Sequence, residues 1–190
     1  MPSDREKVKM FQRDKIEKAI EAIIEAIGDD PKREGLRDTP RRIAQMYQDF
    51  FSGIDQNPSE VLVVGFDENY QGVVVLKDIP FYSICEHHLL PFFGTADIGY
   101  VPNGRVVGAS KLARALDILA HRPQLQERLT DQLADTLFST LQTKGVGVIL
   151  QAEHLCLSIR GATKPGALIV TSATRGCLTR SELLDLVQKR

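Results

Sequence analysis

Residues 92–112 read FFGTADIGYVPNGRVVGASKL, and within this stretch the pattern changes from strand-like to turn-like to helix-like. Phe92–Val101 is rich in aromatic and β-branched residues, which favour strands. Pro102-Asn103-Gly104 is a turn signal, so we expect a hairpin that pairs the end of this strand with Arg105–Gly108. Ser110 follows at a position typical of a helix N-cap. Antiparallel strands that lead into a helix indicate an α+β fold.

The N-terminal part of the chain differs, because its apolar residues recur at helical spacing. Isoleucines at intervals of three and four residues over Ile16–Ile27 predict one helix. A second helix is predicted to begin near Asp38, with a proline in its first turn. We therefore expect an N-terminal helical region, residues 1–58, followed by a larger domain, residues 59–190.

The larger domain adds elements of both kinds. Leucines at i,i+4 spacing predict a helix that begins near Pro123 and is stopped by Gly145. Thr179-Arg180-Ser181-Glu182 is a capping box, which predicts a short helix at the C-terminus. Runs of β-branched residues predict further strands at Val61–Phe66, Gly72–Ile79, Val146–Ala152, Leu155–Ile159 and Ala167–Thr171.

Composition and charge exclude several classes of protein. The chain has 190 residues, of which 43% are hydrophobic and 26% charged, and this argues against disorder. Its 24 Lys and Arg residues against 25 Asp and Glu residues leave a net charge of −1, which gives no indication of nucleic-acid binding. The apolar runs are too short to span a membrane, and the N-terminus is charged. We expect a cytoplasmic protein with no nucleic-acid partner and no membrane partner.

Two short segments gather most of the residues suited to metal binding. Residues 85–88 (CEHH) and 154–156 (HLC) hold two of the three cysteines and three of the four histidines. Thiolate and imidazole are ligands that zinc prefers, and three of them with one open position mark a catalytic site. Any one of these residues alone would more often be structural. The candidate ligands are Cys85, His88 and Cys156, and the candidate proton-transfer residues are His87 and His154.

Other segments carry groups suited to phosphate or to a purine. Residues 108–114 place a hydroxyl and two cations at a helix N-terminus, which suits a phosphate, although a capped helix with solvated cations has the same pattern. Arg160-Gly161 combines a guanidinium group with a residue that lets the backbone approach a ligand. Gln124–Arg128 fits either a purine-reading pair or an exposed helix face.

Taken together, these segments resemble the GTP cyclohydrolase I family. The resemblance extends in order from about Asp30 to the C-terminus and rests on several motifs at once. They are Arg33-Glu34-Gly35-Leu36, Thr39-Pro40, Arg42-Ile43-Ala44, Cys85-Glu86-His87-His88 with Pro91-Phe92, Gly108 with Ser110-Lys111-Leu112 and Arg114, Arg122–Thr130, Gly145-Val146, and His154-Leu155-Cys156 with Arg160-Gly161.

The resemblance implies a reaction, a fold and a site. The implied reaction converts GTP and water into 7,8-dihydroneopterin triphosphate and formate, a first step of folate or pterin biosynthesis, with Zn²⁺ as cofactor. The implied architecture is the tunnelling fold, in which antiparallel sheets with helices outside close a barrel across the subunits of a homo-oligomer, usually a decamer with substrate pockets at subunit interfaces. By position, the implied metal ligands are Cys85, His88 and Cys156, the catalytic residues are His87, His154 and Ser110, and the substrate-binding residues are Gln126, Glu127, Lys111, Arg114, Arg160 and Arg42.

Four positions depart from the family pattern: Asp97, Ala109, Arg175 and Leu178. They leave the metal ligands intact, but they keep open a divergent paralogue that acts on a modified purine nucleotide or stops at the ring-opened formamide. A zinc-stabilised nucleotide-binding protein without turnover would have no need of the non-ligand histidines. A nitrile-reductase relative would need a nucleophilic cysteine and no zinc. The residues indicate neither the end product of the pathway, nor the metal used in the cell, nor a feedback regulatory protein.

Overall fold

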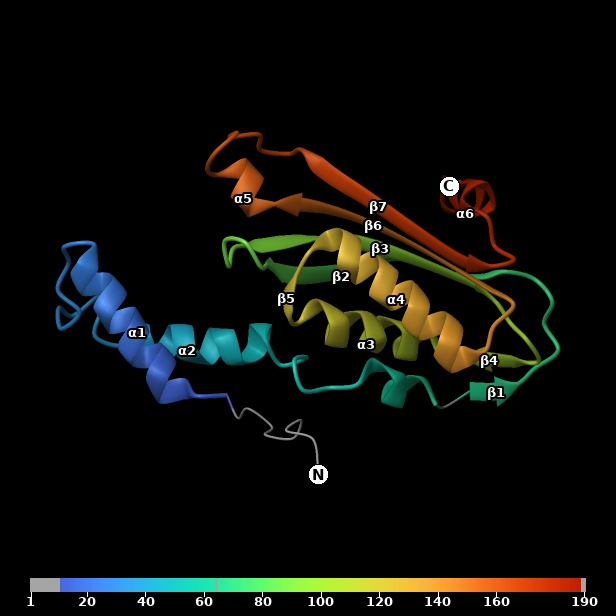
Figure 1. Ribbon diagram of the computed structural model, residues 1–190, viewed down its shortest axis with the longest axis horizontal. Helices are drawn as coiled ribbons and strands as arrows, with labels where there is room; N and C mark the ends of the chain where they lie inside the picture. Colours follow the sequence, from blue (N-terminus) through green and yellow to red (C-terminus); the bar gives the residue numbers. More distant parts are fainter. Residues whose placement is uncertain (1–10, 64, 189–190) are drawn as a thin grey trace, which may run out of the picture.

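The computed structural model describes residues 11–63 and 65–188, which form a mixed α+β fold (Figure 1). The helices are α1 (Arg13–Ala26), α2 (Thr39–Phe50), the 3₁₀ helix η1 (Pro58–Leu62), α3 (Ala109–Ala120), α4 (Gln126–Leu141), α5 (Leu155–Ser158) and α6 (Arg180–Gln188). The strands are β1 (Gly65–Asp67), β2 (Val74–Cys85), β3 (Pro91–Val101), β4 (Arg105–Val107), β5 (Pro123–Gln124), β6 (Gly145–His154) and β7 (Leu168–Gly176). The α+β class predicted from the sequence is confirmed.

A curled sheet of five strands in the order β5-β2-β3-β6-β7 is the centre of the fold (Figure 1). Its pairings are antiparallel, except for the short parallel contact between β5 and β2. β3 and β6 pair along their length, from Phe92 opposite His154 to Val101 opposite Gly145. β7 forms one edge of this sheet, while β1 and β4 pair separately as a small second sheet.

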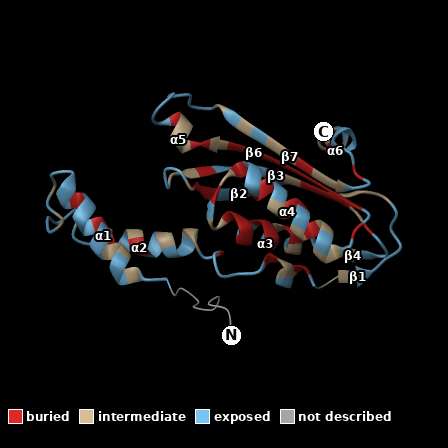
Figure 2. Cartoon of the chain, in the orientation of Figure 1, coloured by how far each residue is buried: buried red, intermediate tan, exposed pale blue. Residues whose placement is uncertain are grey.

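Helices α3 and α4 cover one face of the sheet, and the main core lies between them and the strands (Figure 2). Because successive strand residues point to opposite faces, Val148 and Leu150 face these helices while Ile149 faces away. Leu129, Leu133 and Leu137 of the predicted leucine stripe are fully buried in this core, and Leu141 packs against it partly buried. On the opposite face, Ile149 packs with Leu183 of α6, whose predicted capping box is confirmed.

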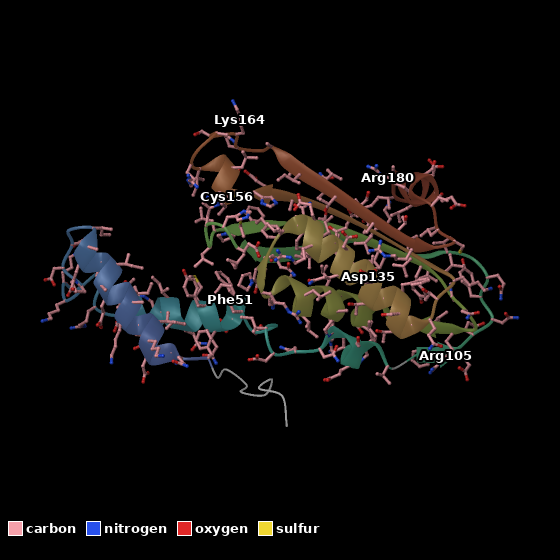
Figure 3. All side chains as sticks on the ribbon, in the orientation of Figure 1. Phe51, Arg105, Asp135, Cys156, Lys164 and Arg180 are labelled. Carbon is pink, nitrogen blue, oxygen red and sulfur yellow. The ribbon has the colours of Figure 1, made fainter. Side chains whose placement is uncertain are left out.

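Helices α1 and α2 form an arm that projects from the sheet domain (Figure 1), and Phe51, labelled in Figure 3, directly follows α2. The arm is attached where α3 leads into β5. The Gly53 amide donates to the His121 carbonyl at 3.0 Å, and the Arg122 guanidinium donates to the carbonyls of Gly53 and Gln56 at 2.8 and 2.6 Å. A Cβ at Gly53 would lie 2.0 Å from the Ile118 carbonyl oxygen, so only glycine permits this approach. The two predicted N-terminal helices are confirmed, and residues 1–10 of that region lie outside the described residues.

The predicted hairpin around Pro102-Asn103-Gly104 is wrong. Arg105–Val107 does form a strand, but it pairs with β1 and not with β3. The reason is that both edges of β3 are already occupied, by β2 on one side and by β6 on the other. The turn residues therefore carry the chain away from the sheet.

Three other local predictions need correction. Val61–Phe66 is not one strand, because η1 extends to Leu62 and β1 begins only at Gly65, with residue 64 outside the described residues. Leu155–Ile159 is not a strand, because Leu155–Ser158 forms the short helix α5; among the described residues, the pairing of β6 with β3 ends at His154 and its pairing with β7 ends at Glu153. Ser110 is the second residue of α3, and Gly108 occupies the N-cap.

The end of α4 also differs from the prediction. Gln142 ends this helix in a left-handed conformation with φ of 49°, and Gly145 is the first residue of β6. Among the described helices, none has the length and apolar character needed to cross a membrane.

Candidate active site

The turn between β2 and β3 carries the first two candidate metal ligands. Cys85 is the last residue of β2, and its amide donates to the Leu90 carbonyl at 2.9 Å. The Leu89 amide donates back to the Cys85 carbonyl at 2.9 Å, with Leu89 in a left-handed conformation. The Glu86 amide donates to the Gln124 carbonyl of β5 at 3.0 Å, which fixes the turn to the adjoining strand. This closed turn directs Cys85 and His88 toward one another.

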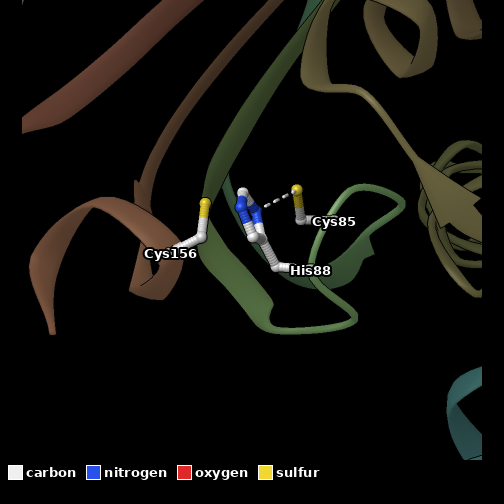
Figure 4. A group of neighbouring side chains, drawn as sticks. All are labelled: Cys85, His88 and Cys156. Carbon is white, nitrogen blue, oxygen red and sulfur yellow. Dashed lines mark hydrogen bonds between the residues drawn. The ribbon is translucent and has the colours of Figure 1, made fainter. Parts of the chain in front are cut away.

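The third candidate ligand comes from the end of β6, seventy residues later. Cys156 lies in α5, directly after the strand that pairs with β3, so the pairing brings it beside the turn (Figure 4). One ligand atom from each of Cys85, His88 and Cys156 lies within 4.8 Å of the others. The Cys85 Sγ and His88 Nδ1 atoms are 4.0 Å apart. The fold therefore brings together the three ligands that the sequence predicted.

The chemistry of these three donors fits zinc. Two thiols and one imidazole are soft and borderline ligands, and three protein ligands leave a fourth tetrahedral position open. Burial raises the pKa of the Cys156 thiol, and the neighbouring Cys85 thiol raises it further. Two thiolates this close would repel each other, and a divalent cation bound between them would stabilise both.

His154 is a buried histidine beside this metal-ligand group. Its ring stacks on Phe92, the residue opposite it in the sheet, with centroids 4.5 Å apart and planes within 6°. Its Nε2 atom lies 2.8 Å from Oε1 of Gln126 on α4. Burial lowers the pKa of His154, and the nearby Glu127 carboxylate partly opposes this effect. The imidazole is therefore held in one position.

Glu127 lies beside a polar hollow at the start of α4. The hollow has a volume of about 340 Å³. Its lining residues are Glu127, Thr130, Asp131, Thr171, Ser172 and Arg180. Gln126, the preceding residue, turns into the protein and is 1% exposed, whereas Glu127 is on the surface.

The sequence analysis missed an ion pair that joins the turn between β2 and β3 to α4. Arg128 donates to both carboxylate oxygens of Glu86, at 2.5 and 3.1 Å. The Arg128 guanidinium lowers the pKa of Glu86, so this carboxyl group is ionised in the folded protein. Glu86 stands between two candidate site residues, and that adjacency was the only sequence signal for its role.

Glu153 was also missed, and it anchors the loop that follows α5. Its Oε1 accepts a hydrogen bond from Ser158 Oγ at 2.6 Å and another from the Gly166 amide at 3.0 Å. These two bonds lower the pKa of Glu153. The loop carries the exposed Arg160, whose charge acts on the Cys156 thiol and which therefore lies near the metal-ligand group.

Among the other candidate residues, His87 lies beside the ligand group, because its ring centroid is 6.2 Å from that of His88. The candidates on α3 and on the arm lie away from the group in the single chain. Ala120, the last residue of α3, accepts a hydrogen bond from Ser83 of β2 at 2.6 Å. Ser110 and Lys111 are in the first turn of this helix; Lys111 precedes Ala120 by nine residues, and Arg114 precedes it by six, which is about 14 and 9 Å of helix. Arg42 is on the arm.

Comparison with known proteins identifies the family of this chain. A family model described as GTP cyclohydrolase I matches residues 16–188. The chain belongs to the GTP cyclohydrolase I family. It is 52% identical over 188 residues to a GTP cyclohydrolase 1 of Dehalococcoides mccartyi, covering 95% of this chain and 100% of the relative.

Two further relatives have the same name. A Streptococcus agalactiae protein is 52% identical over 186 residues, and a Halalkalibacterium halodurans protein is 52% identical over 181 residues, with at least 92% of each chain covered. A solved structure of the archaeosine synthase QueF-Like covers 58% of this chain and 100% of its own, with 18% identity and a TM-score of 0.46. That last likeness is too weak to support an argument. The resemblance inferred from the sequence is confirmed, and the chain is a hydrolase of the GTP cyclohydrolase I type.

The structure accounts for three of the four departures from the GTP cyclohydrolase I pattern. Asp97 accepts a hydrogen bond from the Asp78 amide at 2.8 Å, where β2 bulges and Asp78 takes a φ of 53°. Leu178 packs with Leu183 in the cluster under α6. Arg175 donates to Asp131 and Asp135 of α4 at 3.0 and 2.6 Å. Nothing in the structure explains Ala109.

Proposed function

We propose that this chain converts GTP and water into 7,8-dihydroneopterin triphosphate and formate at a zinc-dependent site. The observation that carries the proposal is the convergence of Cys85, His88 and Cys156 within 4.8 Å, beside the buried His154. A structural zinc site uses four protein ligands, whereas three ligands leave room for a reacting molecule. A histidine that is close by but not part of the ligand set suits proton transfer.

The residues around the site have distinct tasks in this reaction. A zinc ion held by the three ligands supplies Lewis acidity and, at neutral pH, a nucleophilic form of water. Water adds at C8 of guanine, and one C8–N bond breaks to give a formamide. A second water hydrolyses this formamide and releases formate, and the later ring closure returns one water. His154 accepts a proton from the added water and passes it to a ring nitrogen as the imidazole ring opens. His87 and Ser110 serve as acid and base during the ribose rearrangement and ring closure that follow.

Recognition of the base is assigned to Glu127. Its carboxylate lines the polar hollow and influences His154, so a purine bound there would lie between the two. A carboxylate can accept hydrogen bonds from adjacent amino and imino N–H groups on one edge of guanine.

The triphosphate requires cations from more than one copy of the chain. Arg160 lies near the metal-ligand group, but Ser110 and Lys111 are in the first turn of α3, at the end away from this group, and Arg114 is near the middle of the helix. The family is oligomeric, and a neighbouring copy can supply this second group of cations, with Arg42 of the arm as a further contributor. The outer edge of β7 supports such assembly, because Leu168 and Val170 on it are 52% and 57% exposed. We extend this to a decamer whose sheets close a barrel, with the sites at its interfaces.

Incubation of the zinc-loaded protein with GTP tests the proposal. We expect formate together with a pterin that becomes fluorescent after oxidation. The Cys85→Ser variant is the negative control, and Cys177→Ser, which changes an exposed cysteine outside the site, is the matched positive control. Formate without pterin would favour the divergent paralogue that stops at the formamide. Consumption of neither GTP nor a related purine triphosphate would contradict the proposal. The predicted cytoplasmic location stays a prediction.

A further inference from the structure

The side chain of Gln126 uses its polar atoms inside the protein. Its Nε2 atom donates to the carbonyl oxygens of Leu150 and Ile169, at 3.1 and 3.0 Å, and lies 3.1 Å from Thr171 Oγ1. Its Oε1 atom faces His154 Nε2 at 2.8 Å. The residue is 1% exposed within a single chain, so this burial does not depend on assembly.

The orientation of this amide follows from its partners. Backbone carbonyls can only accept hydrogen bonds, so the NH₂ group must face Leu150 and Ile169. Reversing the amide would set its oxygen against two carbonyl oxygens. The oxygen atom therefore faces His154, and the His154 Nε2 atom must carry a proton to donate to it.

A short relay of hydroxyl groups holds Gln126 from the other side. Thr130 Oγ1 donates to the Gln126 carbonyl at 2.7 Å. With its hydrogen committed there, Thr130 accepts from Thr171 Oγ1, 2.6 Å away. The Thr171 oxygen thus faces Gln126 Nε2 as an acceptor, and the two Nε2 hydrogens are shared among three acceptors. Strand β7, helix α4 and strand β6 are joined in one network that ends at His154.

We propose that Gln126 is a positioning residue, which fixes the orientation and the tautomer of His154 and makes Nδ1 the proton-transfer atom. The inference rests on the proposed function and deepens it. In neutral His154 the proton lies on Nε2, so the lone pair is on Nδ1. Stacking on Phe92 opposes rotation of the ring, and a half-turn would place a ring carbon where Nε2 now meets the Gln126 oxygen.

This assignment differs from the role in guanine recognition that the resemblance implies for Gln126. The Gln126 amide is buried, both of its hydrogens are donated, and its oxygen already accepts a hydrogen bond. It therefore has no free donor with which to bind guanine. Glu127 is better placed for that task, because consecutive side chains on a helix point about 100° apart. The two neighbouring residues therefore have different roles, because Glu127 faces the hollow and Gln126 faces His154.

The first test is a spectroscopic measurement on the unchanged, zinc-loaded protein. Nitrogen NMR of ¹⁵N-histidine-labelled protein reports which ring nitrogen carries a proton, and the His154→Ala variant identifies the His154 signals among those of the four histidines. We expect a protonated Nε2 and an unprotonated Nδ1. A proton on Nδ1 of the neutral ring would overturn the inference. This result is independent of turnover, so failure to release formate would count against the proposed function alone.

The second test separates positioning from recognition of the base. In Gln126→Met, which keeps the length of the side chain but not its hydrogen bonds, we expect kcat to fall about 100-fold with zinc content and KM for GTP unchanged. Inhibition by inosine triphosphate, which lacks the 2-amino group, should be unaffected. Gln132→Met, on the same helix and bonded to Gln124, is the matched control and should keep full activity. A raised KM for GTP with altered discrimination, or an unchanged kcat, would overturn the inference. If Gln126→Met does not fold, the NMR measurement decides.

Discussion

If, as proposed, each site is divided between two copies of the chain, pairing two inactive variants should restore activity. One variant, Cys85→Ser, loses the metal-ligand half. The other, Lys111→Ala with Arg114→Ala, loses the cation half in the first half of α3. These two cations precede the last residue of α3 by nine and six residues, about 14 and 9 Å of helix. Neither chain can therefore complete a site by itself, but an intact half from each can meet at an interface.

The expected magnitude follows from random assembly. In an oligomer formed from equal amounts of the two variants, half of the metal-ligand halves and half of the cation halves are intact. Roughly a quarter (½ × ½) of the sites in such an oligomer then combine two intact halves. Formate release should recover to about that fraction of the activity of the unchanged protein.

Co-expression with two different affinity tags gives the assay. Mixed oligomers are purified over both tags, and formate release from GTP is measured per chain. A matched control combines Cys85→Ser with Cys156→Ser, which damage the same half, and should recover nothing. Mixed oligomers as inactive as their parents would refute the division of the site between copies.

Three further predictions concern the metal, the loop anchor and the bulge. Cys156→Ser should lose the bound zinc, about one ion per chain, together with formate release, while Cys177→Ser keeps both; metal analysis showing zinc retained in Cys156→Ser would contradict the ligand assignment. The pKa of Glu153 is lowered in the folded state from its ordinary value of 4.5, so its contribution is present above that pH and is lost as the pH falls through the folded value. Hydrogen exchange over residues 159–167 should therefore accelerate in acid beyond its intrinsic change, and Glu153→Gln should show no such additional change; equal acid responses would argue against the anchor. Asp97→Ala should lower the free energy of unfolding by about 1 kcal/mol, because the Asp78 amide loses its acceptor; an unchanged denaturation midpoint would count against this role.

Elements set by local pattern could be predicted from the sequence. The isoleucine stripe of α1, the leucine stripe of α4 and the capping box of α6 are each complete within a few turns of chain, so their own residues determine them. The three metal ligands could also be predicted, since zinc ligands are restricted to few residue types and these were gathered in two short segments.

Elements that depend on distant partners could not be predicted. Arg105–Val107 follows a typical hairpin turn, but its pairing is decided by which edges of β3 are free, and the partner strand β1 lies about forty residues earlier. The same limit applies to Leu155–Ile159, whose apolar residues are typical of a strand but lie beyond the last described pairings of β6 with its neighbours. Gln126 is the clearest case in the candidate site. Glutamine is a residue type that suits recognition of a purine. Only its contacts with Leu150, Ile169 and His154 reveal that the side chain faces inward.

The edge strand β7 has a consequence for the life of a newly made chain. Leu168–Gly176 contains no proline and no lysine, and its one charge, at Arg175, points to α4. Natural proteins usually protect a long edge strand with proline, lysine or other charged residues, because the free backbone groups of an edge strand can pair with a strand of another chain. A subunit that has left the ribosome before its neighbours are available is therefore at risk of aggregation. Expression at low temperature and moderate synthesis rate should yield more of the protein in usable form than rapid synthesis does.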